Sequence, residues 1–350
     1  MNEPQRDLSG PAFSAGHRSL SRRRFWQLGA AAALTAGATT LFPGRSAGAA
    51  TTDTAQDYFD AAAELAGDDP VLNDLIDALS SDFVVPHPSA PKPLKIFDDV
   101  AVLSVGWVSA TAILTSGGII LIDALNNPTE AKQYIVSGLQ TLGLDPATIK
   151  YVVVTHAHAD HYGGAQYLAD TYGARVMMSP TDWGSVSGSY APTRDLDITD
   201  GQKLTLGSTS VTLRYTPGHT RGTVSPIFPV KWKGAAHSAM LWGGTKPPTS
   251  TTDKQTYLSS VQTFASQMQT AGVGVELSNH AFCDYGLERM AQLRTAPNTT
   301  NNPFVMGTSG AQVFMDVMEN MIRGRIAQDQ GSAATSTVAM AAAGHSGCGC

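Results

Sequence analysis

The stretch Tyr151-Val-Val-Val-Thr-His-Ala-His-Ala-Asp-His-Tyr-Gly-Gly164 decides what this sequence predicts about fold and chemistry. Three valines followed by threonine are typical of a buried strand that ends where the polar residues begin. His156 and His158 follow two positions apart, so in an extended chain both imidazoles point to the same side. Asp160 and His161 come next, where the chain turns into an expected helix. Three imidazoles and a carboxylate within six residues are a ligand set suited to zinc or a similar first-row metal.

The run His156-Ala-His158-Ala-Asp160-His161 resembles the signature of the metallo-β-lactamase superfamily. The alternative is a polar loop with chance histidines, which explains this spacing of ligand-type residues poorly. Asp160 and His161 diverge from the two preceding histidines, as a site for two neighbouring ions requires. The resemblance covers roughly residues 94 to 327. It implies an α/β fold, the four-layer αβ/βα sandwich, with metals at one edge where the two sheets meet.

Composition sets the outer limits on function. With 350 residues, 42% of them hydrophobic and 15% charged, the chain can bury a large core as one large domain or two medium ones. A net charge of −6, with no cluster of Lys and Arg outside the N-terminus, argues against a nucleic-acid partner. Of the three cysteines, Cys283 stands alone and Cys348 and Cys350 lie at the end, so no disulfide framework is expected.

Residues 1–49 have the features of an export signal. Ser21-Arg-Arg-Arg-Phe-Trp26 resembles the twin-arginine motif, and an alanine-rich apolar segment, residues 28–42, follows it. That segment is too short and too rich in small residues for a good membrane span. Ala47-Gly-Ala49 offers the small residues that a signal peptidase prefers. We expect the twin-arginine machinery to export the protein to the periplasm or medium, without stable membrane anchoring after cleavage. A retained N-terminal anchor is the alternative.

Two further segments flank the expected hydrolase domain, residues 94–328. In the arm, residues 50–93, apolar residues recur at three and four, which predicts two helices broken at Asp68-Asp-Pro70. A proline-rich extended connector follows, at residues 84–95. We place this arm outside the superfamily core, and its sequence does not indicate a function. Residues 329–350 are rich in Ser, Ala, Thr and Gly and are expected to form a disordered tail.

Within the hydrolase domain, hydrophobic periodicity predicts strands and helices in both halves. The expected strands cover residues 94–97, 100–105, 110–115, 119–122, 151–155, 174–178, two strands within 203–216, and 224–230, 239–242 and 273–277. The expected helices cover residues 128–142, 162–172, 254–270, 286–293 and 312–326.

A third histidine completes the first metal site that the resemblance implies. His219 lies in the turn Thr216-Pro-Gly-His-Thr220 between two expected strands. In the superfamily, a histidine in such a turn joins the two histidines of the opening loop. By this match His156, His158 and His219 would hold one ion and leave a fourth position for water, as catalytic zinc sites require. A structural histidine at a glycine turn is the alternative.

His280 follows an expected strand, residues 273–277, and would complete a second site with Asp160 and His161. The resemblance therefore implies two Zn²⁺ ions per chain. Asp123 ends another strand at the place of the superfamily's first-motif aspartate. We assign it a supporting role, accepting hydrogen bonds from ligand histidines or nearby backbone. An ordinary strand-ending aspartate is the alternative.

One residue of the wider superfamily pattern is missing. Many members place an aspartate between the third and last histidines to bridge the metals, but between His219 and His280 the only aspartate is Asp253, at an expected helix start. The corresponding strand ends Met240-Leu-Trp-Gly-Gly-Thr245, without Asp or Cys. This departure resembles the β-lactamase subclass with two histidine-rich sites and no cysteine ligand. The likeness weakens where β-lactamases use serines for the substrate carboxylate, because Gly243-Gly-Thr-Lys246 stands there.

The resemblance implies a hydrolase in which a metal-bound hydroxide opens the amide or ester carbonyl of a small molecule, with Asp160 orienting it as a catalytic residue. Hydrolysis of cyclic amides, β-lactams included, is the first hypothesis. A lactonase or other esterase is the second, and an inactive metal-binding scaffold is the third. Candidate substrate-contacting residues are Trp107, Tyr162, Thr220, Thr245 and Lys246. A core position for Trp107 and a solvent-facing side chain for Lys246 remain open alternatives.

Overall fold

The computed structural model describes residues 53–343, with side chains for residues 53–331, so the expected signal segment and residues 344–350 lie outside the described part. The first sheet has seven strands in the order β1-β2-β3-β4-β5-β6-β7. Strands β1 to β4 pair antiparallel and β4 to β7 pair parallel. Their bounds are β1 (Leu94–Phe97), β2 (Val100–Ser104), β3 (Ser109–Thr115), β4 (Gly118–Ile122), β5 (Ile149–Val153), β6 (Arg175–Met178) and β7 (Leu196–Asp197).

The second sheet has five strands in the order β12-β11-β10-β9-β8. Strands β11 and β12 run parallel, and the other neighbours pair antiparallel. The bounds are β8 (Gln202–Leu206), β9 (Thr209–Tyr215), β10 (Val224–Trp232), β11 (Ala235–Trp242) and β12 (Val273–Ser278).

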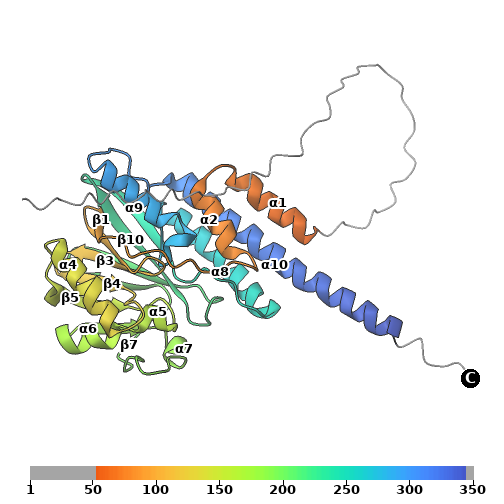
Figure 1. Cartoon of the computed structure of the whole chain (residues 1–350), viewed down its shortest axis with the longest axis horizontal. Helices are drawn as coiled ribbons and strands as arrows, with labels where there is room; N and C mark the ends of the chain where they lie inside the picture. The colour runs from red at the N-terminus through yellow and green to blue at the C-terminus, as the bar shows by residue number, and fades with distance from the viewer. Residues whose placement is uncertain (1–52, 344–350) are drawn as a thin grey trace, which may run out of the picture. The chain divides into compact units, whose positions relative to one another are not determined.

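Helices cover the outer faces of both sheets (Figure 1). The α-helices are α1 (Ala55–Ala66), α2 (Pro70–Leu79), α3 (Pro128–Glu130), α4 (Ser137–Thr141), α5 (Ala159–Tyr162), α6 (Ala165–Tyr172), α7 (Pro180–Trp183), α8 (Thr251–Thr270), α9 (Gly286–Thr295) and α10 (Gly307–Ala343). A π-helix, Ala131–Val136, joins α3 to α4, and short 3₁₀ turns cover Pro146–Thr148 and Ala281–Cys283.

Alternating side chains of the strands separate the core into layers. In β4, Ile119 and Leu121 pack toward α4 and α6, whereas Ile120 and Ile122 pack toward the second sheet. This is the two-residue period of a strand buried on both faces. The outer face of the second sheet packs against α1, α2, α8 and α10. The order helices, sheet, sheet, helices confirms the predicted four-layer α/β sandwich.

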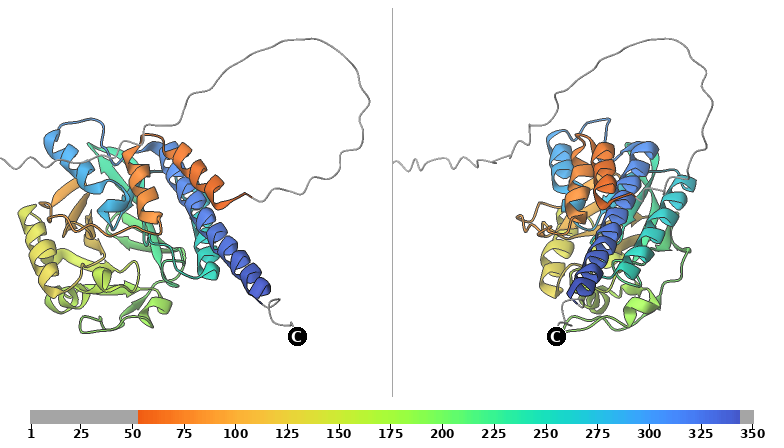
Figure 2. Two further views of the ribbon diagram at one scale, coloured as in Figure 1. Left: turned by 45° about the vertical axis from the view of Figure 1, so that its right-hand side comes forward. Right: turned by 90° about the vertical axis from the view of Figure 1, so that its right-hand side faces the viewer.

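The arm belongs to the same compact unit as the sheets. The two expected helices are present as α1 and α2, and their buried side chains share a core cluster with α8 and α10. Both views of Figure 2 show α1 beside α10. The two helices approach closely at Gly324, where an added Cβ would lie 2.4 Å from the Phe59 ring. Phe59 of α1 therefore sits over a glycine of the last helix.

Helix α10 differs from its sequence expectation. The sequence predicted a helix over residues 312–326 and a disordered tail from residue 329, but α10 runs to Ala343. The prediction for residues 329–343 was wrong because it weighed the small polar residues more than the many alanines, the strongest helix formers. No proline interrupts this segment.

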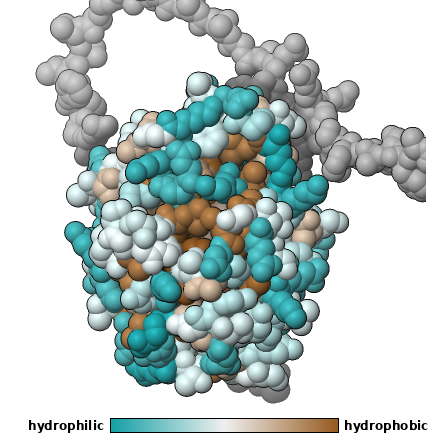
Figure 3. Space-filling view, turned by 90° about the vertical axis from the view of Figure 1, so that its left-hand side faces the viewer, coloured by the Kyte–Doolittle hydropathy of each residue, from teal (hydrophilic) through white to brown (hydrophobic). Residues whose placement is uncertain are grey.

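The surface is mostly hydrophilic on the face that Figure 3 shows, with an apolar hollow among polar side chains. Within residues 53–343, no helix combines the length and the apolar character that crossing a bilayer demands.

Candidate metal centre

Five loops that follow strand ends meet at one edge of the sandwich. In the first sheet, β4 and β5 run parallel, so Asp123 and the loop beginning at Thr155 emerge side by side. In the second sheet, β9, β11 and β12 point the same way, because β10 is antiparallel to both β9 and β11. Their loops carry His219, Gly243 and His280. Parallel strand ends therefore gather residues far apart in sequence, as is usual for sites in α/β folds.

The first group of ligand-type atoms comes from His156, His158 and His219. The Nε2 atom of His219 lies 3.1 Å from Nε2 of His156 and 3.0 Å from Nδ1 of His158. Three ring nitrogens thus converge from two loops, 61 and 63 residues apart in sequence. This trio is the one that the sequence and the resemblance assigned to the first metal.

Backbone oxygens fix which ring nitrogen faces the centre. His156 Nδ1 lies 2.7 Å from the Gly243 carbonyl, and His219 Nδ1 lies 2.7 Å from the Lys246 carbonyl. A carbonyl only accepts, so each Nδ1 donates its hydrogen and each Nε2 keeps its lone pair. Such orientation of ligand imidazoles by outer hydrogen bonds is characteristic of metal sites.

The second group comes from Asp160, His161 and His280. Oδ2 of Asp160 lies 3.1 Å from Nε2 of His161 and 3.6 Å from Nε2 of His280. His280 Nδ1 donates to the Trp107 carbonyl at 3.0 Å, and His161 Nδ1 lies 2.8 Å from Asp123 Oδ2. The geometry therefore brings together all six residues that were expected to ligate metal.

The buried carboxylate of Asp123 connects the two groups of ligand-type residues through hydrogen bonds. Its backbone is left-handed, with φ of 62°, an uncommon conformation for a residue other than glycine. Its carboxylate accepts from the Thr155 amide at 2.7 Å, the Thr155 hydroxyl at 2.9 Å and the Asn279 amide at 3.2 Å. With the His161 contact, these bonds place Asp123 in the supporting position that the resemblance implied.

Electrostatics keep four of the five histidines neutral. Burial and neighbouring imidazoles lower the pKa of His219 to about 3 and that of His280 to about 4. Burial also lowers the pKa of His156 and His158. Neutral imidazoles have the free lone pairs that a metal requires.

In the Asp160–His161 pair, the pKa shifts favour the charged forms of both side chains. Burial alone would lower the pKa of His161, but Asp160 and Asp123 together raise it to about 10. Burial would raise the pKa of Asp160, but His161 and His280 lower it well below its usual range. An ionised carboxylate therefore lies beside a cluster of imidazoles.

These residues fit divalent metal ions. Within the described part of the chain, the buried Nε2 of His161 makes no hydrogen bond, although Asp160 Oδ2 lies 3.1 Å from it. In the first group, lone pairs of His156 and His219 face one another at 3.1 Å, an arrangement that a cation between them would stabilise. His156, His158 and His219 would hold one ion, and Asp160, His161 and His280 a second.

Two positioning residues were missed in the sequence. Asp182, 1% exposed, accepts from the Ala157 amide at 2.8 Å and from the Thr220 hydroxyl at 2.7 Å through one oxygen, Oδ2. It thereby joins both loops of the first group. Asn279 donates to the Gly243 carbonyl at 3.2 Å as well as to Asp123. Asn279 could have been predicted from the sequence because it directly precedes His280. Asp182 could not, because no ligand-type residue lies near it in the sequence.

A cavity of about 200 Å³ opens beside both groups, and its walls include His158, Asp160, His219 and His280. Among the predicted substrate-contacting residues, it is lined by Trp107, Thr245 and Lys246.

The other two expectations for the cavity wall were wrong. The Tyr162 hydroxyl donates to the Ser187 carbonyl at 2.6 Å, and the Thr220 hydroxyl donates to Asp182. Both side chains hold loops in place and are not part of the lining.

Gly244, in the loop after β11 where the sequence offers neither Asp nor Cys, packs closely against His219. A Cβ on Gly244 would lie 2.7 Å from the Cβ, Cγ and Cδ2 atoms of His219. Asp253 lies in the first turn of α8, and the N-cap of this helix is Ser250, whose Oγ accepts from the Asp253 amide at 3.0 Å. The Asp253 carboxylate accepts from the Ser250 hydroxyl at 2.7 Å, so Asp253 lies at the helix start as expected but Ser250 is the capping residue.

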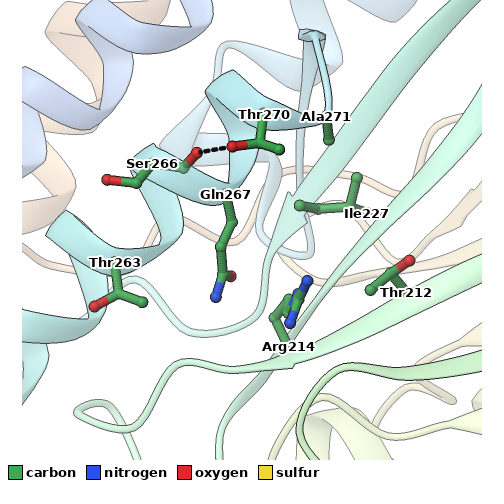
Figure 4. Close-up of a pocket in the computed structure, with 8 residues that line it drawn as sticks. All are labelled: Thr212, Arg214, Ile227, Thr263, Ser266, Gln267, Thr270 and Ala271. Carbon is green, nitrogen blue, oxygen red and sulfur yellow. Dashed lines mark hydrogen bonds between the residues drawn. The ribbon is translucent and has the colours of Figure 1, made fainter.

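A second, larger cavity of about 480 Å³ lies between α8 and the second sheet (Figure 4). Its lining contains Arg214 and Gln267 but no His, Cys, Asp or Glu. It has no metal-ligand character and shares no lining residue with the histidine cavity.

Comparison with known proteins agrees with this geometry. The family described as Metallo-beta-lactamase superfamily matches residues 104–231. The native FEZ-1 metallo-β-lactamase from Legionella gormanii superposes with a TM-score of 0.61 over 70% of this chain and 99% of its own, at 22% identity. Residues 104–231 form a metallo-β-lactamase superfamily domain. BJP-1, a subclass B3 metallo-β-lactamase of Bradyrhizobium japonicum, superposes at a TM-score of 0.55 over 73% of this chain and 98% of its own, at 20% identity. At these identities the likeness establishes the fold.

Sequence relatives match shorter segments of the chain. An uncharacterized Mycobacterium leprae protein is 36% identical over 112 residues, which are 27% of this chain and 49% of that protein. The hydroxyacylglutathione hydrolase of Acidiphilium cryptum is 36% identical over 80 residues, 23% of this chain and 31% of that enzyme. The chain thus spans less than half the length of these relatives. The family that matches residues 104–231 is one of metal-dependent hydrolases.

Proposed function

We propose that this protein is a dizinc hydrolase that opens the amide or ester carbonyl of a small molecule, with cyclic amides such as β-lactams as its first substrate class. The observation that carries this proposal is the pair of adjacent three-residue groups, each with ring nitrogens oriented by outer hydrogen bonds. Bound zinc ions would lower the pKa of a water molecule and polarise the substrate carbonyl.

The protein's own residues would orient the reactants. Asp160 is ionised and borders the cavity, so it can accept a hydrogen bond or a proton from water. Lys246 borders the same cavity and can pair with a substrate carboxylate, as serines do in β-lactamases. Trp107 and its apolar neighbours exclude water from the other side.

Gly244 supports cyclic amides as the first substrate class. Superfamily members that act on thioesters or phosphodiesters place a bridging aspartate at this strand end, and here a side chain would collide with His219. This favours the branch to which FEZ-1 and BJP-1 belong. Lactone or ester hydrolysis is the second candidate, supported by the hydroxyacylglutathione hydrolases among the relatives.

Metal analysis and a substrate panel test the proposal. The zinc-supplemented protein should contain two ions per chain, and His280→Ala should lose mainly one of them. It should open a penicillin, cephalosporin or carbapenem, and both a chelator and Asp160→Ala should abolish turnover. A protein that holds one ion or none contradicts the two-site proposal. Cleavage of lactones or esters alone would establish the second candidate.

Export is a separate proposal, supported by the sequence of the first 49 residues. Changing Arg22 and Arg23 to Lys should leave the precursor in the cytoplasm, because a receptor reads the motif. Normal export of the double variant contradicts a twin-arginine route. Exported protein that still begins at Met1 contradicts cleavage.

A further inference from the structure

The N-terminal arm reaches the active site. Besides the histidines, the 200 Å³ cavity is lined by residues just before and within the proline-rich connector. We call these the arm wall, and they are Ala78, Ser80, Ser81, Phe83 and Val85. The sequence had placed the whole arm outside the catalytic core, so its function was open.

A row of aromatic rings connects the arm wall to a metal-ligand histidine. The Phe83 and Phe282 ring centroids are 5.1 Å apart, and Phe282 stacks at 5.1 Å on His280. His280 in turn stacks on Trp107 at 5.7 Å. His87 of the connector contacts the outer edge of Trp107 at 5.0 Å. One side of the cavity is therefore apolar and aromatic from the arm to the metal centre.

Packing of the arm on the protein body holds this wall in place. Leu75 and Leu79 of α2, the helix that leads into the wall, are fully buried against the outer helices. Asp69 caps α2 by accepting from the Val71 amide at 2.9 Å. Phe59 anchors the preceding helix over a glycine of α10. The wall is thus ordered before a ligand arrives, which reduces the entropic cost of binding.

The chemistry of the wall defines what it can bind. Its five residues carry no charge, and a charged substituent placed there would lose its hydration without gaining a partner. The cations and anions of the cavity, Lys246 and Asp160, belong to other segments. An aromatic or branched alkyl group would bury apolar surface against Phe83 and Val85.

We propose that the arm wall is the specificity surface of this enzyme. It selects amide or ester substrates that carry an uncharged aromatic or branched alkyl group on the acyl side of the scissile carbonyl. The inference rests on the proposed hydrolase function and names the substrate class of that same site.

Substitutions on the two faces of the connector test this proposal. Phe83→Ala and Val85→Ala remove wall side chains, and Val84→Ala is the matched control because Val84 is 83% exposed. The readout is the ratio of kcat/KM for a phenylacetyl substrate to that for the acetyl substrate with the same leaving group. We expect this ratio to fall roughly tenfold or more in Phe83→Ala, as loss of a buried aromatic contact implies. It should stay unchanged in Val84→Ala.

A variant that fills the cavity controls for effects that come from unfolding of the protein. Ser81 is exposed at the rim of the cavity, so Ser81→Trp removes no core packing. It should block the wall and lower the phenylacetyl ratio while thermal stability remains near that of the wild type. An unchanged ratio in Phe83→Ala, Val85→Ala and Ser81→Trp would overturn the proposal.

Binding without turnover separates this proposal from the hydrolase function. Calorimetry of the full chain with phenylacetamide, without added metal, should show binding that Phe83→Ala weakens and Val84→Ala does not. If this pattern appears in a protein that hydrolyses nothing, the hydrolase proposal fails and the arm wall stands as a binding surface. Equal binding to all variants, or none to the wild type, refutes the arm wall itself.

Discussion

Removing the Asp182 carboxylate should weaken the first metal site through the loops that carry it. The buried Oδ2 atom accepts from the Ala157 amide, between two ligand histidines, and from Thr220, next to the third. Hydrogen bonds to a charged group contribute about 1.5–3 kcal/mol each. In Asp182→Ala the Thr220 hydroxyl keeps Thr223 Oγ1 at 2.8 Å, but the Ala157 amide loses its acceptor. We expect the free energy of unfolding of the metal-free protein to fall by about 2–4 kcal/mol.

Asp182→Ala should also weaken metal binding. Changes to residues that hold metal ligands in place typically lower metal affinity by about ten- to a hundredfold. Competition with a chromophoric chelator would measure both affinities, and only that of the site with His156, His158 and His219 should fall. Asp182→Asn is the matched control. One oxygen accepts both bonds, so an asparagine with its oxygen in that position keeps them and should cost about 1 kcal/mol. Wild-type stability and first-site affinity in Asp182→Ala would refute the reasoning.

Three further changes test other parts of the structure. Gly244→Ala should push His219 aside and lower first-site metal content, measured by elemental analysis; full occupancy contradicts this. Burial raises the pKa of Glu276 from 4.5 to about 8, so the folded state retains a proton there and stability should decline as pH rises between these values. Denaturant unfolding of Glu276→Gln should show a flatter decline, and an identical pH profile contradicts it. Gly324→Leu should displace Phe59 and cost about 1–3 kcal/mol in thermal unfolding, and wild-type stability in this variant contradicts the packing described for α1 and α10.

Much of the fold was predictable because its strands are buried on both faces or alternate clearly. The strand expected at residues 151–155 is present as β5, two residues earlier in the chain, and the hairpin around Gly207 joins β8 to β9 as expected. Shorter elements such as β7, with two residues, and α7, with four, were missed because they carry too little periodicity. The end of α10 was missed because alanine, serine and threonine are equally common in tails.

The metal ligands were predictable for a different reason. His156, His219 and His280 lie two to four residues beyond the ends of β5, β9 and β12, and strand direction brings such positions together at one edge. The positions of Tyr162 and Thr220 depend on single hydrogen bonds, to Ser187 and Asp182, which no spacing reveals. The surface against which the arm packs could not be predicted from the sequence. The amphipathic pattern of its two helices shows that one face of each is buried, but it does not identify the partner.

The contact between α1 and α10 has a consequence for the making of the protein. These are the first and last helices of the described chain. Phe59 can therefore pack against Gly324 only after Gly324 has been synthesised. The histidine loops lie between them in sequence and can assemble earlier, as domains begin to fold during synthesis. The connector that borders the cavity, however, is tethered to an element translated at the end. A nascent chain therefore lacks one of the packing partners of α1 and α2 until α10 has been translated.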